Sequence, residues 1–228
     1  MQIAGQVNRI LRPLGLELHR VQPGEPMQAY QPKPNRRLAH FRHLVELIAD
    51  VPGDIVECGV GSGKTLYLLA ALTEHGAHPR RIWGFDSFRG LPPPAAEDRA
   101  ETAPGKIRAG KYAHSRGEIE SRLTGYGISR RSLGKRVILV PGYFPAGFPQ
   151  YSGDPIALLH LDVDLYRSHK DCLEWFEPLV APGGVIAFDE YQNPTWPGAT
   201  LAIDEYFGDP PPGIQKAADW NRWFLVKR

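Results

Sequence analysis

Four carboxylates stand at the ends of two apolar stretches of the chain. The stretch "IALLHLDVD" ends with Asp162 and Asp164, and the stretch "GGVIAFDE" ends with Asp189 and Glu190. Each stretch has the short apolar run that is typical of a buried strand. Neighbouring like charges at a partly buried sheet edge repel and raise one another's pKa, so such clusters need a compensating charge.

A divalent cation would supply that charge. Ligation by carboxylate oxygens alone favours magnesium or calcium over zinc. If the two strands are neighbours in a sheet, about 4.8 Å apart, their terminal carboxylates converge on one point. The sequence therefore predicts a metal site formed by Asp162, Asp189 and Glu190, with Asp164 as a bystander. The alternative is that the aspartates of the first stretch only cap the following helix.

A glycine-rich loop follows another apolar strand, in "DIVECGVGSGKT" at residues 54–65. Its ending, Gly63-Lys64-Thr65, is that of an ATP-binding phosphate loop. Such a loop also requires a glycine five residues before Gly63, and Cys58 stands there. The order strand, Glu57, alternating glycines and helix instead suits a ligand that lies across the strand end with the backbone close against it. The phosphate loop is kept as the alternative.

Asp86 ends the next predicted strand, "RIWGFDSF", about thirty residues further on. A carboxylate at that position can accept hydrogen bonds from both hydroxyls of a ribose. The alternative is an aspartate that caps its own loop.

Strands alternate with helices along most of the chain, which predicts an α/β fold with a mostly parallel sheet covered on both faces. The C-terminal stretch predicts a hairpin that adds an antiparallel edge. Predicted strands lie at 54–58, 81–88, 135–144, 156–164 and 183–190, and the hairpin at 213–228. Predicted helices lie at 36–50, 62–76 with Gly76 as the stop, 117–127, 168–184 with Ser168 as N-cap, and 198–208, whereas 91–117 is irregular.

The composition predicts one large domain. Residues 1–35 form an N-terminal appendage with a proline-rich connector, and residues 36–228 form the domain. The net charge of +2 is too small to indicate nucleic-acid binding. Cys58 and Cys172 read as small buried thiols rather than a disulfide. Neither a signal peptide nor a membrane span is recognisable, so we expect a cytoplasmic protein that does not bind membranes. The sequence is compatible with a homo-oligomer.

Several strings together resemble the class I methyltransferases that use S-adenosylmethionine. More narrowly, the chain is similar to the macrocin O-methyltransferase family of metal-dependent sugar O-methyltransferases. The strings are "VECGVGSGKT", "GFDSFRGLP", "PGYFP", "LLHLDVDLYRSHKDCLE", "GGVIAFDEY" and "GATLAIDEYF". The resemblance implies a Rossmann-like fold with a seven-stranded sheet, and two cofactors, S-adenosylmethionine and Mg²⁺.

The resemblance also implies roles for individual residues. The methionine end of the cofactor is assigned to Glu57, Gly59 and Gly61 and the ribose to Asp86, with Ser62 and Ser87 as further cofactor-binding positions; the adenine is assigned to the neighbourhood of Gly142, Tyr143 and Phe144; the metal is assigned to Asp162, Asp189 and Glu190, with Asp162 also the candidate base. Glu190 departs from the family pattern, which has a second aspartate there.

The implied function is Mg²⁺-dependent transfer of a methyl group from S-adenosylmethionine to a hydroxyl of a sugar or a glycosylated natural product. The partner is a small hydroxylated acceptor, not a nucleic acid. Two alternatives remain at this point. One is a phosphate-loop kinase or NTPase, which explains Lys64 and Asp162 but leaves Asp86 without a role. The other is a noncatalytic protein that keeps the fold.

Overall fold

The sheet positions the strand-end residues of the candidate site. The computed structural model describes residues 35–100, 105 and 107–228, so the predicted appendage and most of its connector lie outside the described residues. Seven strands form one sheet in the order β3-β2-β1-β4-β5-β7-β6. The strands are β1 Asp54–Cys58, β2 Ile82–Asp86, β3 Val137–Pro141, β4 Ile156–Leu161, β5 Val180–Phe188, β6 Gln215–Lys216 and β7 Trp223–Val226.

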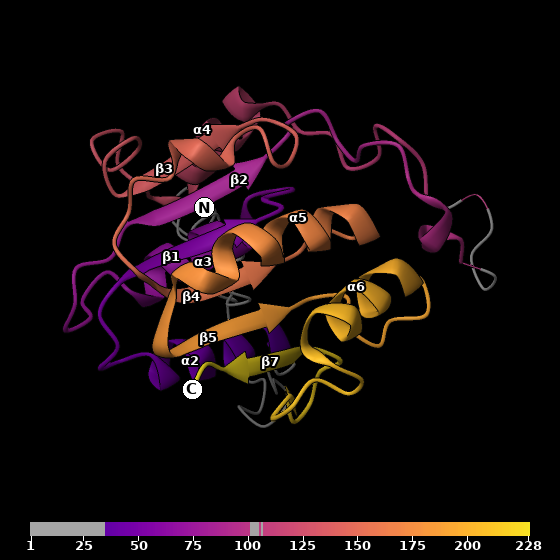
Figure 1. Cartoon of the computed structure of the whole chain (residues 1–228). Helices are drawn as coiled ribbons and strands as arrows, with labels where there is room; N and C mark the ends of the chain where they lie inside the picture. The colour runs from indigo at the N-terminus through magenta and orange to yellow at the C-terminus, as the bar shows by residue number, and fades with distance from the viewer. Residues whose placement is uncertain (1–34, 101–104, 106) are drawn as a thin grey trace, which may run out of the picture.

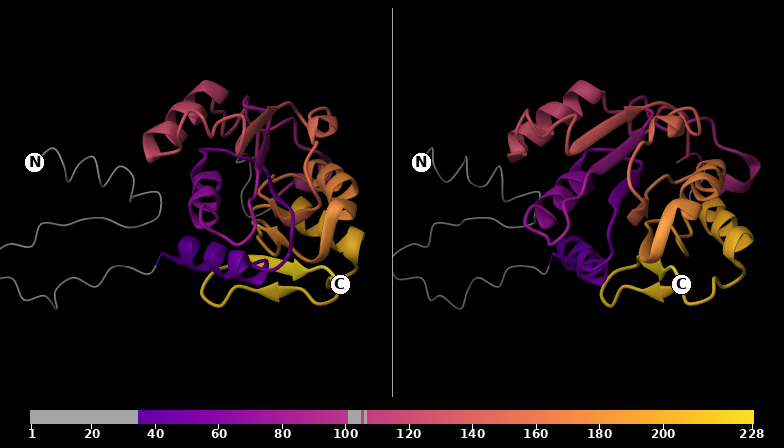
Figure 2. Two further views of the ribbon diagram at one scale, coloured as in Figure 1. Left: turned by 90° about the vertical axis from the view of Figure 1, so that its left-hand side faces the viewer. Right: turned by 60° about the vertical axis from the view of Figure 1, so that its left-hand side comes forward.

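The first five strands run parallel, and β7 pairs antiparallel with both β5 and β6 (Figure 1). Helices cover both faces of the sheet (Figure 2). One face packs against α2 Arg36–Leu47, α3 Lys64–Leu72 and α4 Arg116–Tyr126, and the other against α5 Tyr166–Phe176 and α6 Pro197–Phe207. The predicted fold class, with its antiparallel C-terminal hairpin, is confirmed.

Several predicted boundaries are wrong, among them the end of the helix predicted at 168–184, since α5 ends at Phe176. Helix α3 ends at Leu72 rather than at Gly76, because Thr73 already leaves helical geometry and its hydroxyl donates to the carbonyl of Leu69. Strand β5 begins at Val180, before the glycine pair that was expected to open it. Helix α5 begins at Tyr166, so Ser168 lies inside the first turn and is no N-cap.

Buried side chains fill two layers, one on each face of the sheet. Cys58 and Cys172 are fully buried free thiols of the layer that contains α5, as expected. Leu179 falls within the helix predicted at 168–184, but it lies in a short 3-10 turn after α5 and is 40% exposed. Within the described part of the chain, no helix is both long and apolar enough to cross a bilayer.

Candidate active site

The register of the central strands brings the two acidic stretches together. Cys58 of β1 is paired with Leu161 of β4, and Leu161 with Phe188 of β5. The next residues of β4 and β5 are Asp162 and Asp189. The backbone N–H of Asp162 donates to the carbonyl of Cys58 at 3.0 Å, and that of Asp189 to the carbonyl of Leu161 at 3.0 Å. The parallel sheet therefore sets both carboxylates side by side at its carboxyl edge.

Gly59 lets the glycine loop approach this edge. It has φ +88, and a Cβ on it would lie 1.8 Å from the carbonyl oxygen of Asp162. Only glycine fits this contact, because the obstructing atom is backbone and cannot move aside as a side chain would. The loop and the acidic edge are thus held in direct contact.

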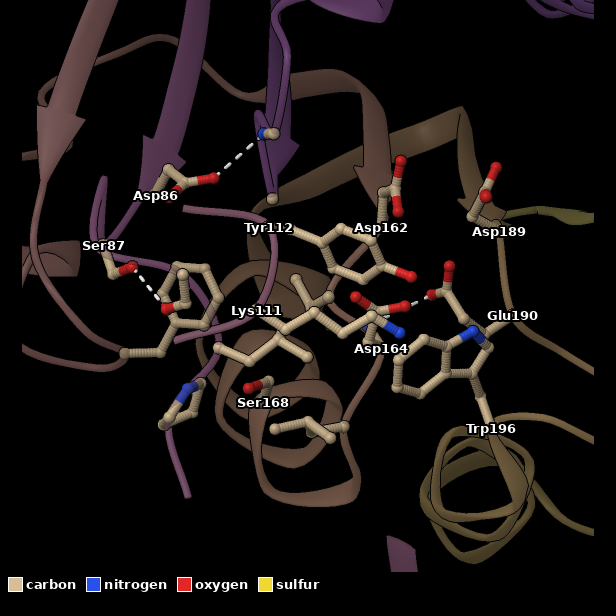
Figure 3. Close-up of a pocket in the computed structure, with 18 of the residues that line it drawn as sticks. Asp86, Ser87, Lys111, Tyr112, Asp162, Asp164, Ser168, Asp189, Glu190 and Trp196 are labelled. Atoms are coloured by element: carbon tan, nitrogen blue, oxygen red, sulfur yellow. Dashed lines mark hydrogen bonds between the residues drawn. The ribbon is translucent and has the colours of Figure 1, made fainter. Parts of the chain in front are cut away.

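A cavity of about 500 Å³ opens along this edge, large enough for a drug-sized ligand. Figure 3 shows part of its lining. The glycine loop, the ends of β2 and β3, and the acidic ends of β4 and β5 all contribute to one wall. Of the predicted site residues, the cavity is lined by Gly59, Gly61, Ser62, Asp86, Ser87, Gly142, Tyr143, Phe144, Asp162, Asp189 and Glu190.

Glu57 is the predicted site residue that does not line the cavity. It is 1% exposed and lies beneath the loop, where its Oε1 is 3.2 Å from Nδ1 of His160. Its Oε2 has no hydrogen-bond partner. Burial raises the pKa of Glu57 above its ordinary value, and the hydrogen bond from His160 opposes that rise. In this structure the side chain of Glu57 therefore links β1 to His160 of β4.

Asp86 binds the glycine loop directly. Its Oδ2 accepts the N–H groups of Val60 at 2.9 Å and Gly61 at 3.0 Å, and its Oδ1 accepts that of Phe88 at 2.7 Å. This is the loop-capping arrangement, yet the carboxylate also faces the cavity (Figure 3). A carboxylate has about four lone-pair sites, so three donors leave room for a ligand hydroxyl.

Two groups of possible metal ligands share Asp162. One contains His160, Asp162 and Asp189, and the other contains Asp162, Asp164 and Glu190; within each group the candidate ligand atoms lie within 4.8 Å of one another. The predicted triad of Asp162, Asp189 and Glu190 draws on both groups. Asp164, which the sequence suggested was a bystander, belongs to the second one, and its N–H points at Oε2 of Glu190 at 3.4 Å. The acidic cluster is therefore a quartet.

The acidic cluster is defined here as Asp162, Asp164, Asp189 and Glu190. Burial and repulsion between like charges together change the pKa values of its carboxylates. Burial, followed by repulsion from Asp189, raises the pKa of Asp162 to about 7. Burial and repulsion from Asp162 raise the pKa values of Asp164 and Glu190 well above their usual range.

Asp189 is the exception in the acidic cluster. Burial alone would raise the pKa of Asp189, but His160 and Arg222 hold it below its ordinary value. For His160 burial would lower the pKa, and Asp189 and Glu57 instead hold it at about 10. The Nε2 of His160 lies 3.9 Å from Oδ1 of Asp189. This distance is too long for a hydrogen bond, so the two groups interact through their charges.

The donors present fit a divalent metal. They are mostly carboxylate oxygens, the ligands that magnesium takes in proteins. The Nε2 of His169, fully buried beside Glu190 at 3.6 Å from its Oε2, also lacks a hydrogen-bond partner. Burial lowers the pKa of His169 to about 4, so its Nδ1 donates to the carbonyl of Leu165 and its Nε2 presents a lone pair to the cluster.

Sequence reasoning missed two arginines that line the cavity from outside the motifs. Arg37 of α2 donates to the hydroxyl of Thr65, at the start of α3, at 2.9 Å. Arg222, in the hairpin between β6 and β7, donates from its Nε to Oδ1 of Asp189. The indole of Trp220 contacts both guanidinium groups, at 5.8 Å from Arg37 and 4.3 Å from Arg222. No local sequence signal marks either arginine, because each is far in the sequence from the acidic ends of β4 and β5.

Asp98 was also missed, and it performs the function that the sequence assigned to Ser168. Its Oδ1 accepts the N–H of Tyr166, the first residue of α5, at 2.7 Å. Its Oδ2 accepts the N–H of Ala95 at 2.8 Å. The residue at the cap position, Leu165, has no side chain able to cap. A buried acid from a distant segment thus fixes the start of the helix that flanks the cavity.

Comparison with known proteins points to one family. The family model described as macrocin O-methyltransferase (TylF) matches residues 7–210. A tetracenomycin rhamnosyl 4'-O-methyltransferase of Streptomyces olivaceus is 34% identical over 161 residues, which are 68% of this chain and 60% of that protein. Mycinamicin III 3''-O-methyltransferase of Micromonospora griseorubida is 29% identical over 166 residues, 70% of this chain and 64% of that protein. The match thus spans about three fifths of the length of these curated relatives.

Solved structures agree with this result. A calicheamicin methyltransferase superposes with a TM-score of 0.70 and 26% identity, over 99% of this chain and 92% of its own. An O-methyltransferase named NovP superposes with a TM-score of 0.67 and 26% identity, over 96% of this chain and 88% of its own.

Proposed function

The chain belongs to the macrocin O-methyltransferase (TylF) family, and we propose that it transfers a methyl group from S-adenosylmethionine to a hydroxyl of a sugar-containing natural product, with Mg²⁺ as its metal. The observation that carries the proposal is that the glycine loop and the acidic cluster line the same cavity. The relatives described above include enzymes that methylate rhamnosyl tetracenomycin and mycinamicin III. The acceptor we infer is accordingly a small glycosylated molecule.

The cofactor half of the cavity would be the part built from β1, β2 and β3. Gly59 and Gly61 carry no side chains, so a ligand can approach the backbone of the loop closely. The N–H of Gly142 donates to the carbonyl of Asp86 at 2.9 Å, which joins the ends of β3 and β2. The ring of Phe144 stacks on Phe148 at 5.3 Å and forms a flat apolar wall on the side assigned to the adenine.

The acceptor half would be the part beside the acidic cluster, whose carboxylates, those of Asp162, Asp164, Asp189 and Glu190, would hold the metal. When bound, Mg²⁺ would lower the pKa of an acceptor hydroxyl and S-adenosylmethionine would supply an electrophilic methyl group. Asp162 would receive the hydroxyl proton on a carboxylate oxygen. Arg222 and His160 would keep Asp189 ionised beside it.

The test is Asp162→Asn, with Asp50→Asn at an exposed position as the matched control. We expect the Asp162 variant to lose about 100- to 10,000-fold in kcat, the range found when a general base is removed. Its dissociation constant for S-adenosylhomocysteine, measured by calorimetry, should stay within about threefold, because the change neither adds nor removes heavy atoms in the cofactor half. An active Asp162→Asn enzyme, or a wild type indifferent to EDTA, would overturn the assignment.

Thermal shift separates this proposal from the phosphate-loop alternative. Lys64 is exposed and begins α3, and Gly63 stands before it as an N-cap with φ 79. The phosphate-loop lysine would instead have to face a ligand. We expect stabilisation by S-adenosylhomocysteine and none by ATP with Mg²⁺. A noncatalytic protein would bind the cofactor but transfer no labelled methyl group to any glycoside in a panel of acceptors.

A further inference from the structure

Lys111 is fixed at the cavity wall by its own backbone. The N–H of Leu91 donates to the carbonyl of Lys111 at 2.9 Å, and the N–H of Gly110 donates to the carbonyl of Leu91 at 2.8 Å. Gly90 makes this close pairing possible, since a Cβ there would lie 2.5 Å from the carbonyl oxygens of both Gly110 and Lys111. These backbone hydrogen bonds between the two segments therefore fix the backbone of Lys111 beside the acidic cluster.

The side chain of Lys111 reaches across the cavity between two aromatic rings. Its Nζ lies 4.5 Å from the ring centroid of Tyr112 and 5.5 Å from that of Trp196. Figure 3 shows the ammonium directed at Asp164 and Glu190. Its charge is the positive one that lowers the pKa of Asp164, against burial and repulsion from Asp162. The ammonium therefore lies within the field of the acidic cluster.

Three arginines of the cavity wall are held by other residues. Arg222 is paired with Asp189, and Arg167 with Asp171 at 2.8 Å. Arg37 donates to Thr65. The ammonium of Lys111 adds a further positive charge, directed at Asp164 and Glu190 (Figure 3).

We propose that the ammonium of Lys111 and the divalent metal occupy the group of Asp162, Asp164 and Glu190 alternately. The inference rests on the metal site of the proposed function. Two cations within a few ångströms repel, and a doubly charged ion with several oxygen ligands binds more strongly than a single ammonium. The lysine side chain is flexible enough to withdraw. The ammonium already contacts the rings of Tyr112 and Trp196, so it can move away from the carboxylates while it keeps this cation–π contact.

The first test measures Mn²⁺ binding to the full chain by electron paramagnetic resonance. Lys111→Met removes the competing charge, so we expect Mn²⁺ to bind roughly tenfold more tightly than to the wild type, the effect of about one charge interaction partly screened by solvent. Lys111→Arg keeps the charge and should bind Mn²⁺ like the wild type. Lys135→Met, at an exposed position outside the cavity, is the matched control and should also be unchanged.

The outcomes separate this inference from the proposed function. If the wild type binds no Mn²⁺, both the metal site and the competition are wrong. If the wild type binds Mn²⁺ and Lys111→Met binds it equally or more weakly, the metal site stands and the competition is wrong.

A second measurement uses the wild type alone and so does not depend on the folding of a variant. In the wild type, Lys111 should react faster with an amine-directed acylating reagent when saturating Mg²⁺ is added, because the metal displaces the ammonium from the carboxylates. Lys135 serves as the internal reference in the same mass spectrum. An unchanged or lower rate at Lys111 on addition of Mg²⁺ contradicts the proposal.

Discussion

Asp162 is the residue at which the end of β4 meets the glycine loop that follows β1. Its N–H binds the carbonyl of Cys58, and its own carbonyl lies against Gly59. Its carboxylate belongs to both groups of possible metal ligands found among the described residues. A shift of this one position would disturb the glycine loop and the acidic cluster together, so backbone packing and chemistry are constrained at the same point.

At the residue scale, Arg37 should matter for cofactor binding. It lines the cavity beside the glycine loop, and the methionine end assigned to that loop carries a carboxylate. Arg37→Met should weaken binding of S-adenosylhomocysteine roughly tenfold, because a hydrogen bond to a charged group contributes about 1.5–3 kcal/mol. Arg36→Met, the exposed neighbour, should have no effect. Equal affinities for the two variants in calorimetry would place the carboxylate elsewhere.

The individual acids were largely visible in the sequence, whereas their balancing charges were not. Asp162, Asp189 and Glu190 end apolar strands, and strand pairing alone brings such ends together. Arg222 approaches Asp189 from a hairpin 33 residues later, and Lys111 comes from an irregular segment. Asp164 lies beyond the end of β4 with φ 60, so strand periodicity could not have placed it in the cluster.

At the element scale, the cap that Asp98 supplies to α5 should be measurable. Asp98→Ala leaves the N–H groups of Tyr166 and Ala95 without their partner. We expect a loss of about 1–2 kcal/mol in the free energy of unfolding, typical of a lost N-cap. That corresponds to a fall in Tm of roughly 2–8 °C for a chain of this size.

Glu97→Ala is the matched control for that experiment, because Glu97 is the exposed acidic neighbour. Differential scanning fluorimetry of both variants is sufficient. Equal Tm values for the two would mean that the cap contributes nothing to stability.

The elements were predicted better than their ends. Strand β1 was predicted as found, because five consecutive buried residues leave a strong apolar signal. The start of α5 was placed two residues late because Ser168 is a good cap by type, whereas the true cap is an acid 68 residues away. A cap supplied through space leaves no trace in the local pattern.

At the scale of the whole molecule, stability should depend on pH through the buried carboxylates. The folded chain holds the pKa of Asp162 at about 7, against an ordinary value of 3.8. Between these two pH values the folded state keeps a proton that the unfolded state has lost. The free energy of unfolding therefore falls as pH rises through this window, by at most about 1.4 kcal/mol per pH unit for each such carboxylate.

Two buried histidines oppose this trend only at lower pH. Burial lowers the pKa values of His40 and His169 to about 4, so they make the fold more stable as pH rises towards 6.5 and have no further effect above it. His160, with its pKa at about 10, acts in the same direction as the carboxylates above pH 6.5. The net expectation is a decline in stability between pH 6.5 and 8.

Added Mg²⁺ should reduce that decline, because it stabilises the ionised carboxylates in the folded state. Urea unfolding at pH 6.5, 7.25 and 8 measures how the free energy of unfolding changes with pH. One series is measured in EDTA and the other in Mg²⁺. Parallel slopes in EDTA and in Mg²⁺ would contradict a metal bound by these carboxylates.

The pairing of Arg222 with Asp189 has a consequence for the order of events on the ribosome. Synthesis delivers a domain from its N-terminus, so β4 and β5 emerge with all four acids before the hairpin that carries Arg222. Until this hairpin is synthesised, Asp189 lacks its arginine and β5 lacks its antiparallel neighbour. A chain that ended before residue 222 would therefore lack one of the positive charges that balance the acidic cluster.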